Sequence, residues 1–164
     1  MLLDLKQLFE IPDEQLSVDT ALDFVHDELF GEYSFASPVL INGKIINRWG
    51  SVMCQFTARY TLSLTCDRCL EQFQQEFTSE LEYTLTRSEE ENYSSDEYCV
   101  EDGVLDLKEF VMSHIMLNLP SKVLCKQDCK GLCTSCGANL NKEQCSCKKT
   151  NIDPRLEILG TLLK

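Results

Sequence analysis

Two long segments in the first half of the chain alternate between apolar and polar residues. The first, SVMCQFTARYTLSLTC, has apolar side chains at Val52, Cys54, Phe56, Ala58, Tyr60, Leu62 and Leu64. In the second, QQEFTSELEYTLTRS, one face carries Phe77, Ser79, Leu81, Tyr83 and Leu85. A period of two is typical of a strand with one buried face. The pattern predicts two long antiparallel strands, and the CDRC sequence between them places Cys66 and Cys69 at the tip of a hairpin.

The residues before this hairpin also favour β-structure. The segment SPVLINGKIINRW is rich in β-branched residues, and its Asn42-Gly43 pair is a signal for a tight turn. Trp49-Gly50 forms a second break, and residues 100–104 have the composition of a short strand. We therefore expect an antiparallel sheet within residues 35–102.

Other segments space their apolar residues as helices do. Residues 18–30 place Val18, Leu22, Val25 and Leu29 near helical spacing. Residues 105–118 form a stronger pattern, with Asp106 as the cap and Pro120 after the end. The tail DPRLEILGTLLK predicts a short amphipathic helix capped by Asp153. Residues 1–10 fit a strand or a helix, and His114 lies among apolar residues, where we expect a hydrogen-bonded packing role.

These elements predict an α+β fold in which an antiparallel β-sheet, curled into a partial barrel, packs against helices. The length of 164 residues fits one domain with a small appendage. We assign residues 1–120 and 150–164 to the α+β domain. Residues 121–149 form a cysteine-rich, zinc-binding appendage, a small C-terminal zinc knuckle.

Six of the ten cysteines lie in the stretch CKQDCKGLCTSCGANLNKEQCSC. The N-terminal sequence lacks the features of a signal peptide, and no run of apolar residues is long enough to span a membrane. We therefore expect a cytoplasmic protein in a reducing compartment. Clustered cysteines there favour metal ligation or redox chemistry over disulfides.

The spacing of the cysteines predicts two sites with four thiolate ligands each. CTSCG is a zinc-knuckle pattern, and CSC follows it after eight residues. These two motifs form one closed site: Cys133, Cys136, Cys145 and Cys147. The remaining pairs, each two ligands short, form the second: Cys66, Cys69, Cys125 and Cys129. Such a site would clip the hairpin tip to the chain that follows the helix.

Three other interpretations of the cysteines remain open. A single metal site could use four of the six clustered cysteines and leave CDRC for redox chemistry. A redox pair usually sits at a helix N-terminus, whereas CDRC lies between strands. An iron–sulfur cluster also accepts four cysteines. Disulfides are disfavoured by the expected compartment.

The charge is distributed unevenly along the chain. The net charge is −12, which argues against a protein that coats nucleic acid with its whole surface. The acidic residues concentrate before residue 104, and this part is either a solvated surface or a face for a basic partner. The basic residues of the C-terminal part include candidate RNA or phosphate contacts: Lys126, Lys130, Lys148 and Lys149. Four thiolates around each dication would offset that positive charge.

The sequence gives no positive sign of an enzyme. A catalytic zinc site keeps an open position and usually includes histidine or a carboxylate, whereas both predicted sites are all-cysteine. We find no phosphate-binding loop, dinucleotide fingerprint or nucleophile elbow. We therefore expect a non-enzymatic protein, and identify no small-molecule substrate.

Four motifs, in order, resemble the YceD-like family, also called the large ribosomal RNA subunit accumulation protein family. They are CDRCLEQF, LDLKEFVMSHIMLNLP, CKQDCKGLCTSCGANLN with its following CSC, and DPRLEILGTLL. The extra knuckle is similar to that of Firmicutes members. The resemblance implies a bacterial, cytoplasmic factor that supports accumulation or processing of large-subunit rRNA. It also implies binding to a ribosomal protein, a precursor large-subunit particle or rRNA. The alternative is a thiol-based redox or metal-responsive regulator that uses CDRC.

Overall fold

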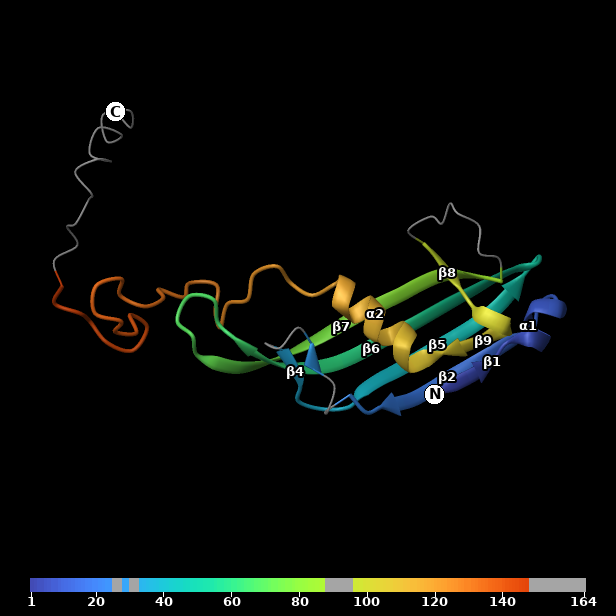
Figure 1. Ribbon diagram of the computed structural model, residues 1–164, viewed down its shortest axis with the longest axis horizontal. Helices are drawn as coiled ribbons and strands as arrows, with labels where there is room; N and C mark the ends of the chain where they lie inside the picture. The colour runs from blue at the N-terminus through green and yellow to red at the C-terminus, as the bar shows by residue number, and fades with distance from the viewer. Residues whose placement is uncertain (25–27, 30–32, 88–95, 148–164) are drawn as a thin grey trace, which may run out of the picture.

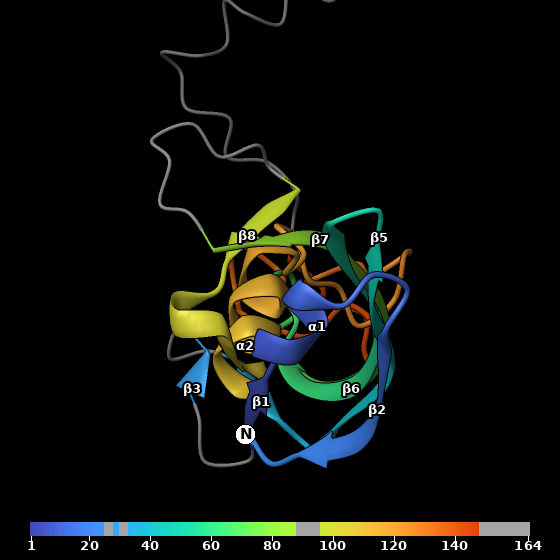
Figure 2. The same ribbon diagram turned by 90° about the vertical axis from the view of Figure 1, so that its right-hand side faces the viewer.

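The computed structural model describes residues 1–24, 28–29, 33–87 and 96–147. The fold is an elongated, curled β-sheet with a few helices packed against it (Figures 1 and 2). This confirms the predicted α+β class. The helical elements are α1 (Lys6–Glu10), α2 (Leu107–Leu117) and a short 3-10 turn (Glu101–Gly103). The strands are β1 (Leu2–Asp4), β2 (Gln15–Leu22), β3 (Glu28–Leu29), β4 (Tyr33–Phe35), β5 (Val39–Arg48), β6 (Ser51–Thr65), β7 (Gln72–Thr86), β8 (Glu97–Cys99) and β9 (Val104–Asp106).

Strand β6 is the centre of the main sheet. It pairs antiparallel with β7 from Val52–Leu85 to Thr65–Gln72 without interruption, which confirms the predicted long hairpin. The other edge of β6 pairs with β5 as far as Arg59 and with β4 at Leu62 and Ser63. Strand β2 extends the sheet past β5, and β8 adds a short parallel pairing to β7. A separate pair, β1 with β9, joins the N-terminal residues to the start of α2.

The concave face of the curled sheet and helix α2 enclose the core (Figure 2). All seven apolar positions predicted on the inner face of β6 are buried. The carboxylate of Asp106 caps α2 by accepting hydrogen bonds from the backbone N–H groups of Lys108 and Glu109. Phe110 on α2 packs edge-to-face on Phe56, with ring centroids 6.5 Å apart.

His114 has the packing role expected from its position. It is 8% exposed, and its Nε2 lies 2.7 Å from the Ser79 hydroxyl. Its Nδ1 lies 2.9 Å from the Tyr83 hydroxyl. Burial lowers the pKa of the imidazole, because the charged form loses hydration. The neutral ring therefore links α2 to β7 through two polar contacts.

The helix predicted over residues 18–30 is wrong where the structure describes it, because β2 occupies its first part. Val18 and Leu22 are both buried on one face of that strand. A spacing of four residues fits a helix and a strand equally, so these two positions did not distinguish them. Pairing with β5 decides the conformation, since β2 pairs with it along its whole length.

The tight turn predicted at Asn42-Gly43 is also wrong. Strand β5 continues through both residues, and both of them pair with residues of β6. A Cβ at Gly43 would collide with the Gln55 carbonyl oxygen and lie 2.7 Å from the Phe56 Cα. Glycine is therefore required here by the close approach of β6, not by a turn. The break predicted at Trp49-Gly50 is confirmed as the β5–β6 turn.

Three smaller predictions remain. The strand over residues 100–104 is wrong, because the 3-10 turn Glu101–Gly103 separates β8 from β9. The first ten residues contain both of the predicted alternatives, strand β1 and helix α1. The helix predicted in the tail lies outside the described residues. The division into an α+β domain and an appendage at 121–149 stays a prediction.

Candidate metal centres

Four cysteines from two distant segments meet at the tip of the β6–β7 hairpin; we call them the hairpin site: Cys66, Cys69, Cys125 and Cys129. Their sulfur atoms all lie within 4.8 Å of one another. The Cys66–Cys129 and Cys69–Cys125 sulfur pairs are 3.8 and 3.6 Å apart. A tetrahedral zinc ion with Zn–S bonds of about 2.3 Å requires sulfurs about 3.8 Å apart. These separations fit a metal ion and are far longer than a disulfide bond.

Polar side chains of the CDRC turn fix the chain that follows α2 against the hairpin. Asp67 accepts a 2.7 Å hydrogen bond from the Val123 N–H, and its own N–H donates to the Val123 carbonyl at 2.9 Å. Arg68 donates from Nη1 to the Cys129 carbonyl at 2.8 Å. A Cβ at Gly131 would lie 3.0 Å from the Arg68 carbonyl oxygen, and its φ is +75°. Glycine therefore permits this close contact.

The hairpin site favours bound cations electrostatically. Burial opposes ionisation of Cys66, but N–H groups of Cys125, Arg68 and Cys69 outweigh it and lower its pKa to about 6. For Cys125, burial and the neighbouring thiols Cys69, Cys129 and Cys66 raise the pKa to about 12. Without a cation, the first thiolates formed disfavour the others. A dication removes this conflict, since it stabilises all four thiolates together.

The second group, the knuckle site, forms within one short segment: Cys133, Cys136, Cys145 and Cys147. Its four sulfurs also lie within 4.8 Å of one another. The CTSCG turn is closed by hydrogen bonds from Gly137 N–H to the Cys133 carbonyl and from Cys133 N–H to the Ala138 carbonyl. Gly137 has a φ of +75°, the left-handed conformation that such a turn needs.

The knuckle site repeats this electrostatic pattern in a more exposed setting. The N–H groups of Ser135 and Cys136 lower the pKa of Cys133 to about 6. The neighbouring thiol of Cys136, followed by burial, raises the pKa of Cys147 to about 12. Cys136 is exposed, whereas the hairpin site has three buried ligands. A metal ion in the knuckle site would therefore be more accessible to solvent.

The loop of the knuckle site contacts the hairpin site. Asn141 belongs to the loop between the two cysteine pairs of the knuckle site, and its Nδ2 donates to the Cys129 sulfur at 3.3 Å. Its Oδ1 accepts from the Lys130 N–H at 2.9 Å. The same loop contacts the hairpin through Lys142, whose ammonium lies 2.9 Å from Glu71.

The structure thus brings the eight predicted ligands together in the two predicted groups. Sequence reasoning missed Asp67, Arg68 and Asn141, which position these ligands. The position of Asp67 and Arg68 inside CxxC was a usable signal, since ligands need oriented neighbours. Nothing in the sequence pointed to Asn141. Cys54, expected as a buried strand residue, is buried in β6, and burial raises its pKa to about 12.

The predicted RNA-contact lysines are only partly described. Lys126 and Lys130 are exposed in the segment around Cys129. Lys148 and Lys149 lie outside the described residues. The structure therefore places two basic side chains next to the hairpin site.

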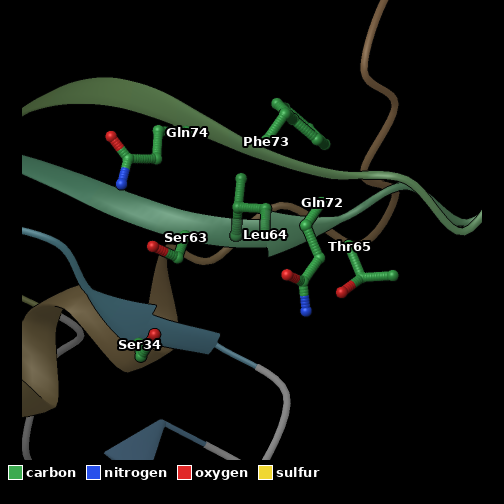
Figure 3. Close-up of a pocket in the computed structure, with 7 residues that line it drawn as sticks. All are labelled: Ser34, Ser63, Leu64, Thr65, Gln72, Phe73 and Gln74. Carbon is green, nitrogen blue, oxygen red and sulfur yellow. The ribbon is translucent and has the colours of Figure 1, made fainter.

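A pocket of about 460 Å³ opens beside the same hairpin, where β6 continues past the end of β4 (Figure 3). Its lining residues come from β4 and from the facing ends of β6 and β7: Ser34, Ser63, Leu64, Thr65, Gln72, Phe73 and Gln74. These side chains offer hydrogen bonds but no acid, base or thiol. The pocket itself therefore supplies no titratable side chain for acid–base catalysis.

Among the residues that the structure describes, none of the helices is both long and apolar enough to cross a membrane.

Several known proteins are similar to this chain in sequence. One is the chloroplastic large ribosomal RNA subunit accumulation protein YCED homolog 1 of Arabidopsis thaliana, which is 23% identical to this chain over 161 residues. That alignment covers 80% of this chain and 50% of the plant protein, so the chain spans about half its length. The protein YlbN of Bacillus subtilis (strain 168) is 26% identical, with 96% of this chain and 94% of YlbN covered. No solved structure matches the chain significantly.

The family profile described as "Large ribosomal RNA subunit accumulation protein YceD" matches residues 54–163. This range includes most of β6, all of β7 and α2, and all eight cysteines of the two sites. The match covers more than half of the chain, and the chain therefore belongs to the YceD family.

Proposed function

We propose that this protein is a non-enzymatic factor of ribosome biogenesis that supports accumulation of large-subunit rRNA in the cytoplasm. The observation that carries the proposal is the family match over residues 54–163. The name of the plant relative points to the same process. The acidic balance of the chain, −12 overall, suits a basic partner such as a ribosomal protein on a precursor particle.

The direct test is depletion of the protein in its native cells, followed by fractionation of ribosomes. We expect less mature large-subunit rRNA, with the small-subunit rRNA unchanged. An affinity-tagged protein should recover large-subunit rRNA or ribosomal proteins above an untagged control. Unchanged rRNA after depletion, together with no recovery of large-subunit material, would refute the proposal.

We assign a structural zinc ion to each of the two sites. All-cysteine ligation leaves no open position for substrate, and the sulfur separations of 3.6 and 3.8 Å in the hairpin site suit tetrahedral zinc. The hairpin-site zinc ion would join the cysteine-rich segment to the α+β domain, whereas the knuckle-site zinc ion would stabilise that segment internally. On this assignment the protein acts through its surfaces and not through catalysis.

The redox alternative makes a different prediction about the thiols. Structural zinc thiolates should resist mild alkylation of the native protein until a chelator is added. A redox-active CDRC pair, with the Cys66 pKa near 6, should instead react at once. Mass spectrometry of alkylated peptides separates the two. Immediate modification of Cys66 or Cys69 in the metal-loaded protein would support the redox regulator.

A second role, direct contact with RNA phosphate, rests on the exposed Lys126 and Lys130 beside the hairpin site. Neutralising these residues together with Lys148 and Lys149 should weaken RNA binding and flatten its dependence on salt concentration. Filter binding of large-subunit rRNA at several salt concentrations measures this. If the neutralised variant bound RNA with the same affinity as the wild type, the proposed RNA contact would be refuted. The proposed role in large-subunit rRNA accumulation would not be affected.

A further inference from the structure

Strand β7 leaves most of one edge unpaired in the described part of the molecule. One edge pairs with β6 along the whole strand, while β8 pairs with the other only at residues Thr84, Leu85 and Thr86. Figure 1 shows β7 along one border of the sheet, with β8 crossing it near its carboxyl end. Upstream of Thr84, no described segment forms backbone hydrogen bonds with this edge.

The orientation of the unpaired groups follows from the bonds around β8. Thr84 donates its N–H to the Asp96 carbonyl, and Thr86 accepts from the Val100 N–H. Backbone groups of alternate residues point to the same edge of a strand. The same edge therefore presents the N–H and C=O groups of five further residues, which we call the open β7 edge: Gln74, Glu76, Thr78, Glu80 and Glu82. All five side chains are exposed on the outer face.

Natural sheets usually protect such an edge with proline, lysine, a bulge or a short strand. Here the pairing with β6 continues without a bulge, and β7 contains no proline, lysine or arginine. Three of the five residues of the open β7 edge are exposed glutamates, and none of them forms an ion pair among the described residues: Glu76, Glu80 and Glu82. Glutamates on the same face repel a second β7 strand but attract lysine or arginine.

We propose that the open β7 edge binds an extended basic segment of a protein partner, which adds to the sheet as a further strand. Backbone hydrogen bonds to the edge provide the affinity, as in other complexes formed by strand addition. Alternate lysine or arginine side chains on the partner lie beside Glu76, Glu80 and Glu82 and select a basic sequence. That this segment belongs to a large-subunit ribosomal protein rests on the proposed function, whereas the binding mode does not.

A peptide of alternating lysine and valine, about ten residues long, is a suitable probe because it matches the strand length and charge spacing. We expect it to bind the metal-loaded protein in fluorescence anisotropy and to shift β7 amide signals in NMR spectra. A peptide with the same side chains but N-methylated alternate amides keeps the charge and loses the backbone donors. Equal binding of both peptides would overturn strand addition.

Two variants test the same surface from the protein side. Thr78→Pro removes one backbone N–H donor of the edge, a change that edge strands tolerate. It should lower the affinity for the peptide roughly tenfold or more. Replacing all three glutamates by glutamine should lower the affinity for the peptide roughly tenfold. The matched control neutralises three exposed aspartates elsewhere, Asp13→Asn, Asp19→Asn and Asp102→Asn, and should bind as the wild type does. Thermal melting checks that each variant is folded.

Other occupants would give different results. If a second copy of the chain occupied the edge, sedimentation would show a dimer, and Thr78→Pro would abolish that dimer. This result would overturn the proposal of a basic partner. Unchanged peptide binding in Thr78→Pro would also overturn the proposal. If the peptide tests fail but tagged protein still recovers large-subunit material, the proposed function stands without this surface. If the peptide binds but no large-subunit material is recovered, the edge stands and the proposed function fails.

Discussion

At the scale of single residues, Asn141 is the side chain that joins the two metal sites. It donates to the Cys129 sulfur from a loop that the knuckle site itself closes. Replacing Asn141 by alanine removes a hydrogen bond to a thiolate, and outer-shell contacts of this kind are worth about tenfold to a hundredfold in metal affinity. We therefore expect Asn141→Ala to lower zinc affinity at the hairpin site by at least about tenfold.

A chelator competition that resolves the two zinc ions measures this effect. Gln144→Ala is the matched control, because Gln144 is an exposed side chain in the same loop. The prediction fails if Asn141→Ala and Gln144→Ala release zinc at the same chelator concentration.

His114 gives the fold a dependence on pH. Its pKa in the folded protein is lowered by burial, whereas in the unfolded chain it is near 6.5. The unfolded state therefore binds more protons below about pH 6.5, so the free energy of unfolding falls as the pH is lowered through this range. We expect a shallower fall in His114→Gln, although this variant starts from lower stability.

Urea denaturation at pH 7.0 and at about pH 5.5 tests this, since the wild-type and variant proteins share all other titrating groups. The difference between the two pH values should be larger for the wild type. Equal differences would show that His114 does not contribute.

At the scale of elements, the sequence predicted best where one pattern had one interpretation. The β6–β7 hairpin follows from strict alternation over many residues, and the α2 cap follows from Asp106 before a helical pattern. The β2 strand was missed because Val18 and Leu22 satisfy both periods. The Asn42-Gly43 signal failed because the close approach of β6 is a tertiary contact, which local sequence does not encode. The structure groups the cysteines in the two predicted sets, which ligand number had limited to few combinations, but their role as metal ligands stays a prediction.

That tertiary requirement makes Gly43 a sensitive position. Gly43→Ala would push a methyl group into the Gln55 carbonyl and the Phe56 backbone, and we expect it to reduce the free energy of unfolding by about 3 kcal/mol. Gly50→Ala is the control, since nothing lies within 4 Å of its added Cβ and only its φ of +86° is unfavourable. That change should cost about 1 kcal/mol. Urea denaturation of both variants decides it, and an equal or smaller loss in Gly43→Ala would contradict the prediction.

At the scale of the whole molecule, the two sites close loops of different length. Cys69 and Cys125 of the hairpin site are 56 residues apart, so a metal ion bound there would join the cysteine-rich segment to the sheet. The knuckle site closes only the segment from Cys133 to Cys147. A metal ion that closes the longer loop removes more conformational entropy from the unfolded chain, because this entropy grows with the logarithm of loop length. The difference corresponds to about 1 kcal/mol of additional stability from the hairpin site. Three of the four hairpin-site cysteines are also buried, whereas the knuckle site is more exposed.

We therefore expect the two sites to contribute unequally to stability. The wild type should contain two zinc ions by metal analysis, and the double variants Cys66→Ser/Cys69→Ser and Cys133→Ser/Cys136→Ser one each. The first variant should melt at a lower temperature than the second, because only it separates the cysteine-rich segment from the hairpin. A wild type with one zinc ion that survives Cys66→Ser/Cys69→Ser would contradict the two-site assignment. Equal melting temperatures of the two variants would show that the hairpin site does not join the cysteine-rich segment to the sheet.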